Sequence, residues 1–197
     1  MNDITTAEMN AVLTIVKGPE QNYNANNLAK AIGVTPMGAL KILKRLKKES
    51  ILKSKTIGKA VIYSINTRDG YAIRYVSLIL LRESLYANKQ IKRWVEEFKK
   101  IKNADLIILF GSILNKLNPN DIDVLLVTDK KRFSKLQQEI KEINELSIKK
   151  IHPLYQTFED LINNIKKRDK PLLSAIKGIL VLGEEKFIEA YNESYKE

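Results

Sequence analysis

The sequence predicts an α+β fold in two domains, and three observations support this prediction. The first third of the chain combines apolar residues at helical spacing with the signal of a β-hairpin. From Asp105 onwards, short apolar strands alternate with helical segments, which is typical of a sheet covered by helices. The net charge of +11 lies entirely in residues 1–103, which carry 19 Lys and Arg against 8 Asp and Glu. The two parts therefore differ in both pattern and charge.

The composition excludes several classes of protein. With 197 residues, of which 44% are hydrophobic and 29% charged, the chain can bury two small cores, so we do not expect disorder. It has no bilayer-length apolar run and no basic-then-apolar leader, so we expect no membrane partner and a cytoplasmic protein. Without cysteine, and with His152 as its single histidine, it excludes disulfides, Cys-ligated zinc and all-histidine sites. We therefore expect carboxylates to hold any metal.

The N-terminal elements follow from spacing and from capping signals. The spacing predicts a helix over residues 6–17 and a short second helix closed by Gly33. Thr35 and the proline after it are typical of a helix start, and the third helix runs to about Glu49. Residues 51–65 then form two extended runs around a Gly-Lys turn. The predicted order is helix, helix, turn, helix and β-hairpin.

The third helix has one apolar and one cationic face. Its apolar face contains Ala39, Ile42, Leu43 and Leu46, and its cationic face contains Lys41, Lys44, Arg45 and Lys48. The hairpin adds Lys53, Lys55 and Lys59, which suit contacts to backbone phosphate. The positions best placed to reach base edges are Thr35, Met37, Gly38 and Lys41, and none is an Arg, Asn or Gln. Phosphate contacts are therefore expected to supply most of the affinity for duplex DNA, and no operator sequence follows.

Residues 26–66, NNLAKAIGVTPMGALKILKRLKKESILKSKTIGKAVIYSIN, resemble the winged-helix transcription regulators of archaea and bacteria. The resemblance implies a winged helix-turn-helix domain whose third helix enters the major groove. Because such regulators are commonly two-fold dimers, it also implies a homodimer, for which the helix expected over residues 70–87 is long enough to pair with a second copy. The alternative is a winged helix used for protein contacts, with the lysines as a solvated surface.

The rest of the chain divides into a connector and a second domain. The predicted boundaries are residues 1–66 for the DNA-binding domain, 67–103 for two connector helices and 104–197 for the second domain. In the second domain the runs LIILF, DIDVLLVT, IKKIHPLYQT and GILVLG predict four strands. The helices between and after them are expected over residues 132–146, 158–167 and 184–195.

Two polar motifs interrupt the apolar strands of the second domain. Gly111 and Ser112 follow the first strand, and Asp121 and Asp123 begin the second. Since side chains alternate along a strand, the two aspartates share a face and can bind Mg²⁺ that also bridges the phosphates of a nucleotide. Gly111 permits close approach of the backbone, and the Ser112 hydroxyl can hold a phosphate. We expect the aspartates to lie beside the Gly-Ser turn in an open cleft.

This pattern of Gly-Ser, a short spacer and Asp-x-Asp resembles the nucleotidyltransferase superfamily that includes DNA polymerase β, and in particular its minimal single-domain members. The resemblance implies a nucleotidyltransferase-fold α/β domain with a mixed sheet. It also implies that Gly111 and Ser112 bind the triphosphate of a nucleoside triphosphate, and that Asp121 and Asp123 bind the metal and, in an active enzyme, are catalytic.

The second domain also departs from that family. Ile113 and Leu114 stand where the minimal members usually have an Arg, and the spacer before the aspartates is short. The predicted third strand contains no Asp or Glu, so the third carboxylate, the expected base, is missing. His152 or Gln156 of that strand can project toward the site, but neither replaces a carboxylate as a metal ligand, and His152 beside a proline is more often a packed residue. Glu159 and Asp160, just after the strand, are the first substitutes to test.

Three functions remain open from the sequence. The leading one is a DNA-binding transcriptional regulator whose second domain binds a nucleotide or another effector with little or no catalysis. The alternative is an active Mg²⁺-dependent nucleotidyltransferase that modifies a protein or RNA, as antitoxin-like minimal members do. The third is a protein-interaction scaffold. The missing carboxylate and the cationic third helix favour the first.

Overall fold

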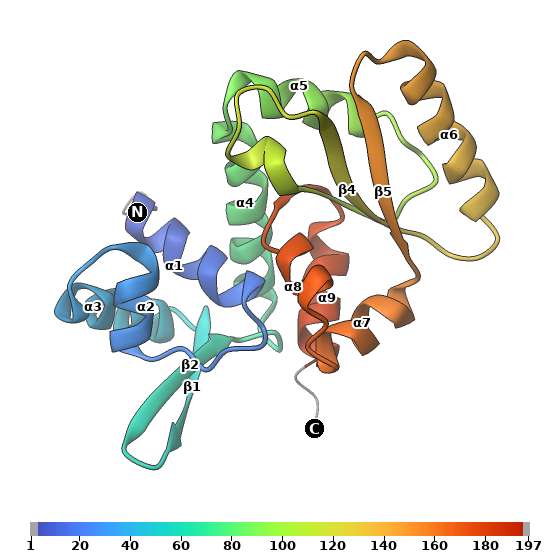
Figure 1. The fold of residues 1–197 in the computed structure, drawn as a ribbon. Helices are drawn as coiled ribbons and strands as arrows, with labels where there is room; N and C mark the ends of the chain where they lie inside the picture. Colours follow the sequence, from blue (N-terminus) through green and yellow to red (C-terminus); the bar gives the residue numbers. More distant parts are fainter. Residues whose placement is uncertain (1–3, 195–197) are drawn as a thin grey trace. The chain divides into compact units, whose positions relative to one another are not determined.

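A computed structural model describes residues 4–194 of the chain, and Figure 1 shows its elements. The fold is α+β with one two-stranded and one four-stranded sheet, as predicted. The chain divides into two compact units, Met1–Ile79 and Leu80–Glu197. Among the described residues, no helix combines the length and the apolar character that crossing a membrane requires.

The first unit begins with three helices, α1 (Thr6–Lys17), α2 (Ala25–Ile32) and α3 (Pro36–Lys48), as the sequence predicts. Each has a side-chain N-cap, which satisfies backbone N–H groups that the first turn leaves unpaired. The turn between α2 and α3 depends on Gly33, which ends α2 with a φ of +69°, a left-handed conformation that favours glycine. Thr35 then accepts a hydrogen bond from the Gly38 amide and begins α3.

The two-stranded sheet is a hairpin of β1 (Leu52–Ile57) and β2 (Ala60–Ile65). The strands pair antiparallel from Leu52↔Ile65 to Ile57↔Ala60 around the predicted Gly-Lys turn. An isolated bridge between Tyr23 and Tyr63 joins the loop after α1 to β2. The hairpin is therefore tied to the helices at its base, while its tip is exposed.

Two helices occupy the segment that the sequence assigns to a connector: α4 (Gly70–Tyr86) and α5 (Lys89–Phe98). The division between the compact units falls inside α4. Ala72, Val76 and Ile79 in the first part of α4 are buried. Trp94 and Phe98 of α5 belong to the core of the second unit.

The four-stranded sheet of the second unit has the strand order β5-β4-β3-β6. Its strands are β3 (Leu106–Phe110), β4 (Asp121–Val127), β5 (Lys150–Gln156) and β6 (Ile179–Leu182). β3 is antiparallel to both β4 and β6, whereas β4 and β5 are parallel, so the sheet is mixed. A short 3₁₀ helix, η1 (Gly111–Leu114), connects β3 to the loop before β4.

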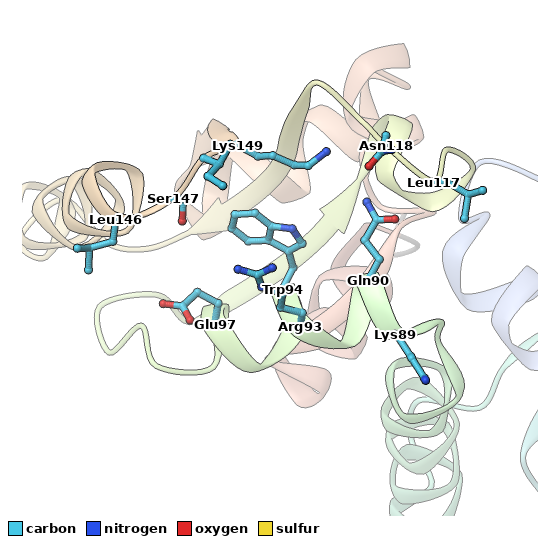
Figure 2. Close-up of a pocket in the computed structure, with 11 residues that line it drawn as sticks. Lys89, Gln90, Arg93, Trp94, Glu97, Leu117, Asn118, Leu146, Ser147 and Lys149 are labelled. Atoms are coloured by element: carbon cyan, nitrogen blue, oxygen red, sulfur yellow. The ribbon is translucent and has the colours of Figure 1, made fainter.

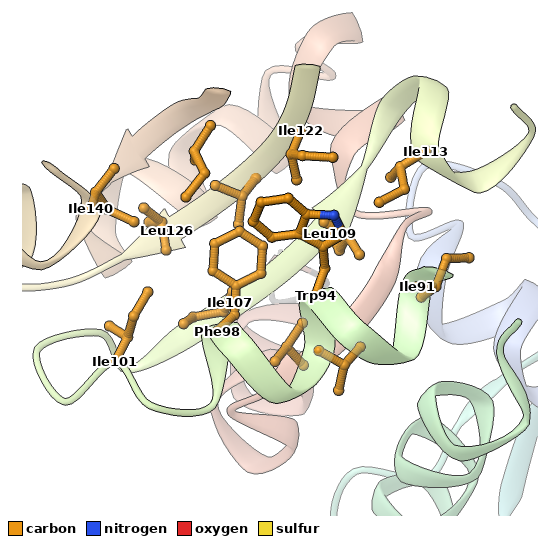
Figure 3. Packing of buried hydrophobic residues seen from close by; sticks show 14 of the residues in the cluster. Ile91, Trp94, Phe98, Ile101, Ile107, Leu109, Ile113, Ile122, Leu126 and Ile140 are labelled. Carbon is orange, nitrogen blue, oxygen red and sulfur yellow. The ribbon is translucent and has the colours of Figure 1, made fainter. Parts of the chain in front are cut away.

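The main core of this unit lies on one face of the sheet, under α5 and α6 (Phe133–Leu146). Figure 3 shows Trp94 and Phe98 of α5 packed beside Ile107 and Leu109 of β3. The two rings have their centroids 5.7 Å apart, which suits a favourable tilted aromatic pair. Ile122 and Val124 point into the same core, so alternation turns Asp121 and Asp123 to the opposite face.

Three further helices pack against strands of this sheet: α7 (Phe158–Lys166), α8 (Lys170–Ala175) and α9 (Glu184–Ser194). α7 begins with a capping box in which Thr157 and Asp160 satisfy each other's backbone amides. The sequence predicted α7 and α9 to within two residues; residue 195, included in the predicted last helix, lies outside the described residues. The Gly111 turn and Asp121 lie at one end of the sheet, where β3 ends and β4 begins.

Candidate functional site

The first candidate site is a row of exposed lysines on α3, which we call the α3 lysine face. It consists of Lys41, Lys44 and Lys48, all exposed, opposite the buried residues Ala39, Leu43 and Leu46. Met37 is 62% exposed in the first turn of α3, where Thr35 is also exposed. The face therefore offers positive charge along one side of a helix that directly follows a helix-turn.

The structure assigns Arg45 a different position from the one expected. Its guanidinium forms an ion pair with Glu8 of α1, whose side chain is only 3% exposed, and approaches Glu49 at 3.5 Å. Arg45 thus neutralises a buried carboxylate instead of lying on the α3 lysine face. Periodicity could not show this, because it places Arg45 near the cationic stripe but does not reveal which helix packs beside it.

The same polar cluster includes Tyr75 of α4. Burial raises the pKa of the Tyr75 phenol, and the Glu8 carboxylate raises it further, while Arg45 opposes the change. Thr5 also donates both its amide and its hydroxyl to the Glu8 carboxylate. Glu8 therefore joins a helix cap to the interior of the unit.

The hairpin presents a second group of lysines. Lys53 and Lys55 lie two residues apart on β1, so their exposed side chains share one face, and Lys59 is exposed in the turn. Lys47 of α3 and Lys30 of α2 are also exposed, although neither was among the predicted DNA contacts. A helical wheel of α2 and of α3 places both lysines outside the apolar face, so the sequence could have indicated them.

The second candidate site joins the Gly111 turn to the aspartates of β4. Phe110 of β3 is the register partner of Asp123, which places the turn directly beside that carboxylate. Gly111 has a φ of +78°, and a Cβ built there would lie 2.0 Å from Asp123 Oδ2. Both the conformation and the contact therefore require glycine. The predicted proximity of the Gly-Ser turn to Asp123 is confirmed, whereas the open cleft expected around the aspartates stays a prediction.

His152 completes this group, contrary to the expectation of a packed residue. Its side chain is 61% exposed, and its Nδ1 lies 3.1 Å from Asp121 Oδ2. β5 runs parallel to β4 with His152 as the register partner of Asp123, so the imidazole shares the face of the aspartates. One ligand atom from each of Asp121, Asp123 and His152 lies within 4.8 Å of the others. We call these residues the Asp-Asp-His cluster.

The two substitutes suggested for the third carboxylate lie too far away. Glu159 and Asp160 follow the carboxyl end of β5, whereas Asp121 is paired with Lys150 at its start. At about 3.3 Å per residue, the strand separates them from Asp121 by about 20 Å. Asp160 is also engaged, because hydrogen bonds from Thr157 lower its pKa. That expectation was therefore wrong, and its cause was the direction of β5.

That distant end of the sheet holds its own ion pairs. Arg132 binds Asp105, before β3, and Asp129, after β4. These hydrogen bonds raise the pKa of Arg132, and its guanidinium lowers the pKa of Asp129. Both carboxylates serve to hold loops together, so the Asp-Asp-His cluster draws no ligand from them.

A groove with a volume of about 570 Å³ lies beside the loops that lead into β4 and β5. Figure 2 shows Trp94 of α5 in it, with residues from both loops around it. It is lined by three cations and one carboxylate, Lys89, Arg93, Lys149 and Glu97. Leu117, Leu146 and Ile148 are 90% to 101% exposed at its margin.

Lys149 of this groove also donates a hydrogen bond to the Pro119 carbonyl, which links the loop before β5 to the loop before β4. The groove could not be predicted, since its residues are scattered along the chain.

Comparison with known proteins adds little to this geometry. No protein-family model matches the chain, and no curated protein matches it. A single-site variant of Lactococcus lactis ZitR is similar at 16% identity and a TM-score of 0.37, over 51% of this chain and 64% of that chain. The apo form of a double variant of the same protein is similar at 19% identity and a TM-score of 0.35, over 49% and 69%. At such TM-scores the similarity indicates no function for this chain.

Proposed function

We propose that this protein is a DNA-binding transcriptional regulator that contacts duplex DNA through the α3 lysine face and the hairpin lysines. The observation that carries the proposal is that Lys41, Lys44 and Lys48 are all exposed on the first helix after the α2–α3 turn. A helix in that place is the one that helix-turn-helix proteins insert into the major groove, and a lysine row releases counterions from phosphate. The first unit, with its hairpin and resemblance to winged-helix regulators, suits this role.

The test measures binding of the full chain to duplex DNA by fluorescence anisotropy over a range of salt. We expect the triple variant Lys41→Ala, Lys44→Ala and Lys48→Ala to lower the slope of log affinity against log salt by about 0.9 for each phosphate that it no longer neutralises. The matched control is Lys130→Ala, Lys131→Ala and Lys135→Ala, which removes the same charge from exposed positions of the second unit. Equal losses of affinity in both variants would contradict a specific interface and indicate only nonspecific attraction.

For the second unit we propose a nucleotidyltransferase-like domain that binds a nucleoside triphosphate through a divalent cation, Mg²⁺ in the family it resembles. Three features support this: the mixed sheet with β4 beside β3 and β5, the contact of Gly111 with Asp123, and the shared face of the two aspartates. Ser112 lies in η1 beside that turn, and we propose that its hydroxyl contacts a phosphate. A ligand with different affinity for two states of the protein can shift their balance, which gives a regulator its signal.

Calorimetry with a panel of nucleotides and Mg²⁺ tests this second proposal. Asp121→Asn with Asp123→Asn is expected to abolish cation-dependent binding, because neutral amides hold Mg²⁺ far more weakly than carboxylates. The control, Asp129→Asn, changes a carboxylate at the far end of the sheet. Cation-dependent binding that survives the double change would place the nucleotide elsewhere.

An active transferase is the second candidate function, and the cationic groove favours it. Lys89, Arg93 and Lys149 can hold an acidic protein or an RNA near the loop that leads to Asp121. Among the described residues no third carboxylate joins the cluster, so the acceptor hydroxyl lacks the usual base and any transfer is expected to be slow. Label transfer from a nucleoside triphosphate to protein or RNA, abolished in the Asp121→Asn and Asp123→Asn double variant, would decide for the enzyme.

We also propose that the protein acts as a homodimer. One side of α4 carries four exposed apolar residues at the spacing of a heptad repeat: Tyr71, Leu78, Leu81 and Leu85. Arg74, which is also exposed, occupies the position between Tyr71 and Leu78. Such a stripe is the pattern through which two helices pair. Light scattering of the full chain tests it: Leu78→Glu with Leu85→Glu is expected to give monomers, and a mass unchanged by that variant and equal to one chain would remove the proposal.

A further inference from the structure

The Asp-Asp-His cluster brings two kinds of ligand to one place. Asp121 and Asp123 come from β4, and His152 comes from the parallel neighbour β5, in register with Asp123. Their ligand atoms lie within 4.8 Å of one another, and His152 Nδ1 is 3.1 Å from Asp121 Oδ2. Two oxygens and one nitrogen therefore converge on one face of the sheet.

This spacing fits a single divalent cation. Bonds of about 2.1 Å place neighbouring ligand atoms about 3–4 Å apart, so side-chain rotations that move these atoms by about 1–2 Å close the group around an ion. Asp123 is held against the Gly111 turn, which limits its movement. His152 and Asp121 are 61% and 36% exposed, so the remaining coordination positions are open to water or to phosphate oxygen. A nucleotide could thus join the ion without displacing a protein ligand.

The mixed ligand set determines which cation binds best. Mg²⁺ requires oxygen ligands in a near-ideal octahedron, whereas imidazole nitrogen suits the first-row transition metals. Replacing the usual third carboxylate with a neutral imidazole also removes one negative charge, which weakens the site for a hard ion most of all. We propose that the Asp-Asp-His cluster is a transition-metal site, selective for ions such as Mn²⁺ and Zn²⁺ over Mg²⁺. This inference rests on the proposed cation-dependent nucleotide site and specifies its metal.

His152 has one competing role, in which it only orients Asp121 by a hydrogen bond. Asn at this position separates the two roles, because its side-chain amide can donate to Asp121 but supplies no imidazole nitrogen. If His152 only positions Asp121, His152→Asn keeps the metal affinity. If His152 is a ligand, His152→Asn weakens binding of transition-metal ions and removes the nitrogen ligand, because an amide oxygen suits these ions less well than imidazole nitrogen.

The experiment titrates Mn²⁺ into the full chain without nucleotide and follows free Mn²⁺ by electron paramagnetic resonance. We expect one bound Mn²⁺ with nitrogen coupling in its pulsed spectrum, displaced by Zn²⁺ at far lower concentration than by Mg²⁺. His152→Ala and His152→Asn are each expected to weaken Mn²⁺ binding at least tenfold and to remove the nitrogen coupling. His152→Asp, which restores three carboxylates, is expected to lower the Mn²⁺ to Mg²⁺ affinity ratio at least tenfold.

Two outcomes overturn the inference. One is bound Mn²⁺ without nitrogen coupling and with unchanged affinity in His152→Asn; the other is a site that Mg²⁺ fills as readily as Mn²⁺. Either leaves the proposed function intact if Asp121→Asn with Asp123→Asn still abolishes cation and nucleotide binding. Failure of the proposed function looks different, since Mn²⁺ then binds with nitrogen coupling while nucleotide or DNA binding is absent. Circular dichroism of each variant checks that it is folded.

Discussion

Lys44 and Arg45 are adjacent cations on α3. The sequence predicts that both contact DNA, but the structure gives them different surroundings. Lys44 is exposed on the α3 lysine face, whereas Arg45 pairs with the buried Glu8. We therefore predict that Lys44→Ala weakens DNA binding without changing stability, and that Arg45→Ala lowers stability with a smaller change in the salt dependence of binding.

The magnitudes follow from exposure. Breaking a fully buried ion pair costs about 3–5 kcal/mol, but the Arg45 side chain is 32% exposed, and Thr5 continues to donate to Glu8 after the change. Water and Thr5 thus reduce the expected loss of stability for Arg45→Ala to about 1–3 kcal/mol. In a unit of this size that lowers Tm by about 4–8 °C for each kcal/mol. Lys44→Ala removes one exposed cation, so stability changes by less than about 0.5 kcal/mol and the salt slope falls by about 0.9.

Thermal unfolding and salt-dependent anisotropy on both variants provide the assay. Adding Glu8→Gln to Arg45→Ala is expected to recover part of the stability, because it removes the unpaired charge and keeps a side chain that can serve the α1 cap. A fall in the salt slope for Arg45→Ala as large as that for Lys44→Ala, with an unchanged Tm, would show that Arg45 contacts DNA and does not stabilise Glu8.

Three further predictions concern the second unit. Gly111→Ala is expected to displace Asp123 and to lower cation affinity at least tenfold in calorimetry, since the added Cβ occupies the carboxylate's position; unchanged affinity would contradict the contact. Thr157→Ala is expected to cost about 1 kcal/mol in urea unfolding through removal of the α7 cap. Hydrogen bonds from Thr157 lower the pKa of Asp160. The Asp160 carboxylate therefore stabilises the fold at pH values above the usual carboxyl pKa, and this stabilisation is lost as the pH falls through the lowered pKa. Wild type should show this decrease in acid titration of unfolding, and Thr157→Ala, which keeps only the backbone hydrogen bond to Asp160, should show a smaller one.

Local signals in the sequence were sufficient for the elements. Gly33 and Thr35 fix the α2–α3 turn through left-handed backbone and an N-cap, both of which depend on neighbouring residues alone. Alternation along β4 likewise places Asp121 and Asp123 on one face, whatever packs around them. These parts of the fold and of the site could therefore be predicted.

Features that depend on tertiary packing could not. Because β5 runs parallel to β4, His152 and not Asp160 lies beside the aspartates. The segment IKKIHPLYQT alone does not indicate which strand it pairs with or in which direction. Arg45 similarly lies near a cationic stripe by periodicity, and only the packing of α1 against α3 gives it a buried partner. The groove beside Trp94 joins three distant segments and has no sequence signature.

The register of β4 and β5 explains why the aspartates have a histidine, and not a third carboxylate, beside them. In a parallel pair, the residue beside Asp123 is fixed by the start of β5, and that residue is His152. In the proposed metal site, a carboxylate there would complete an oxygen site for Mg²⁺ and supply a base, whereas imidazole would provide a nitrogen ligand. His152 at this position therefore disfavours nucleotidyl transfer and favours binding of a metal ion and a nucleotide without transfer. A bound ion and nucleotide would persist longer where transfer is slow, which fits the proposed role of the second unit as the ligand-binding domain of a DNA-binding regulator.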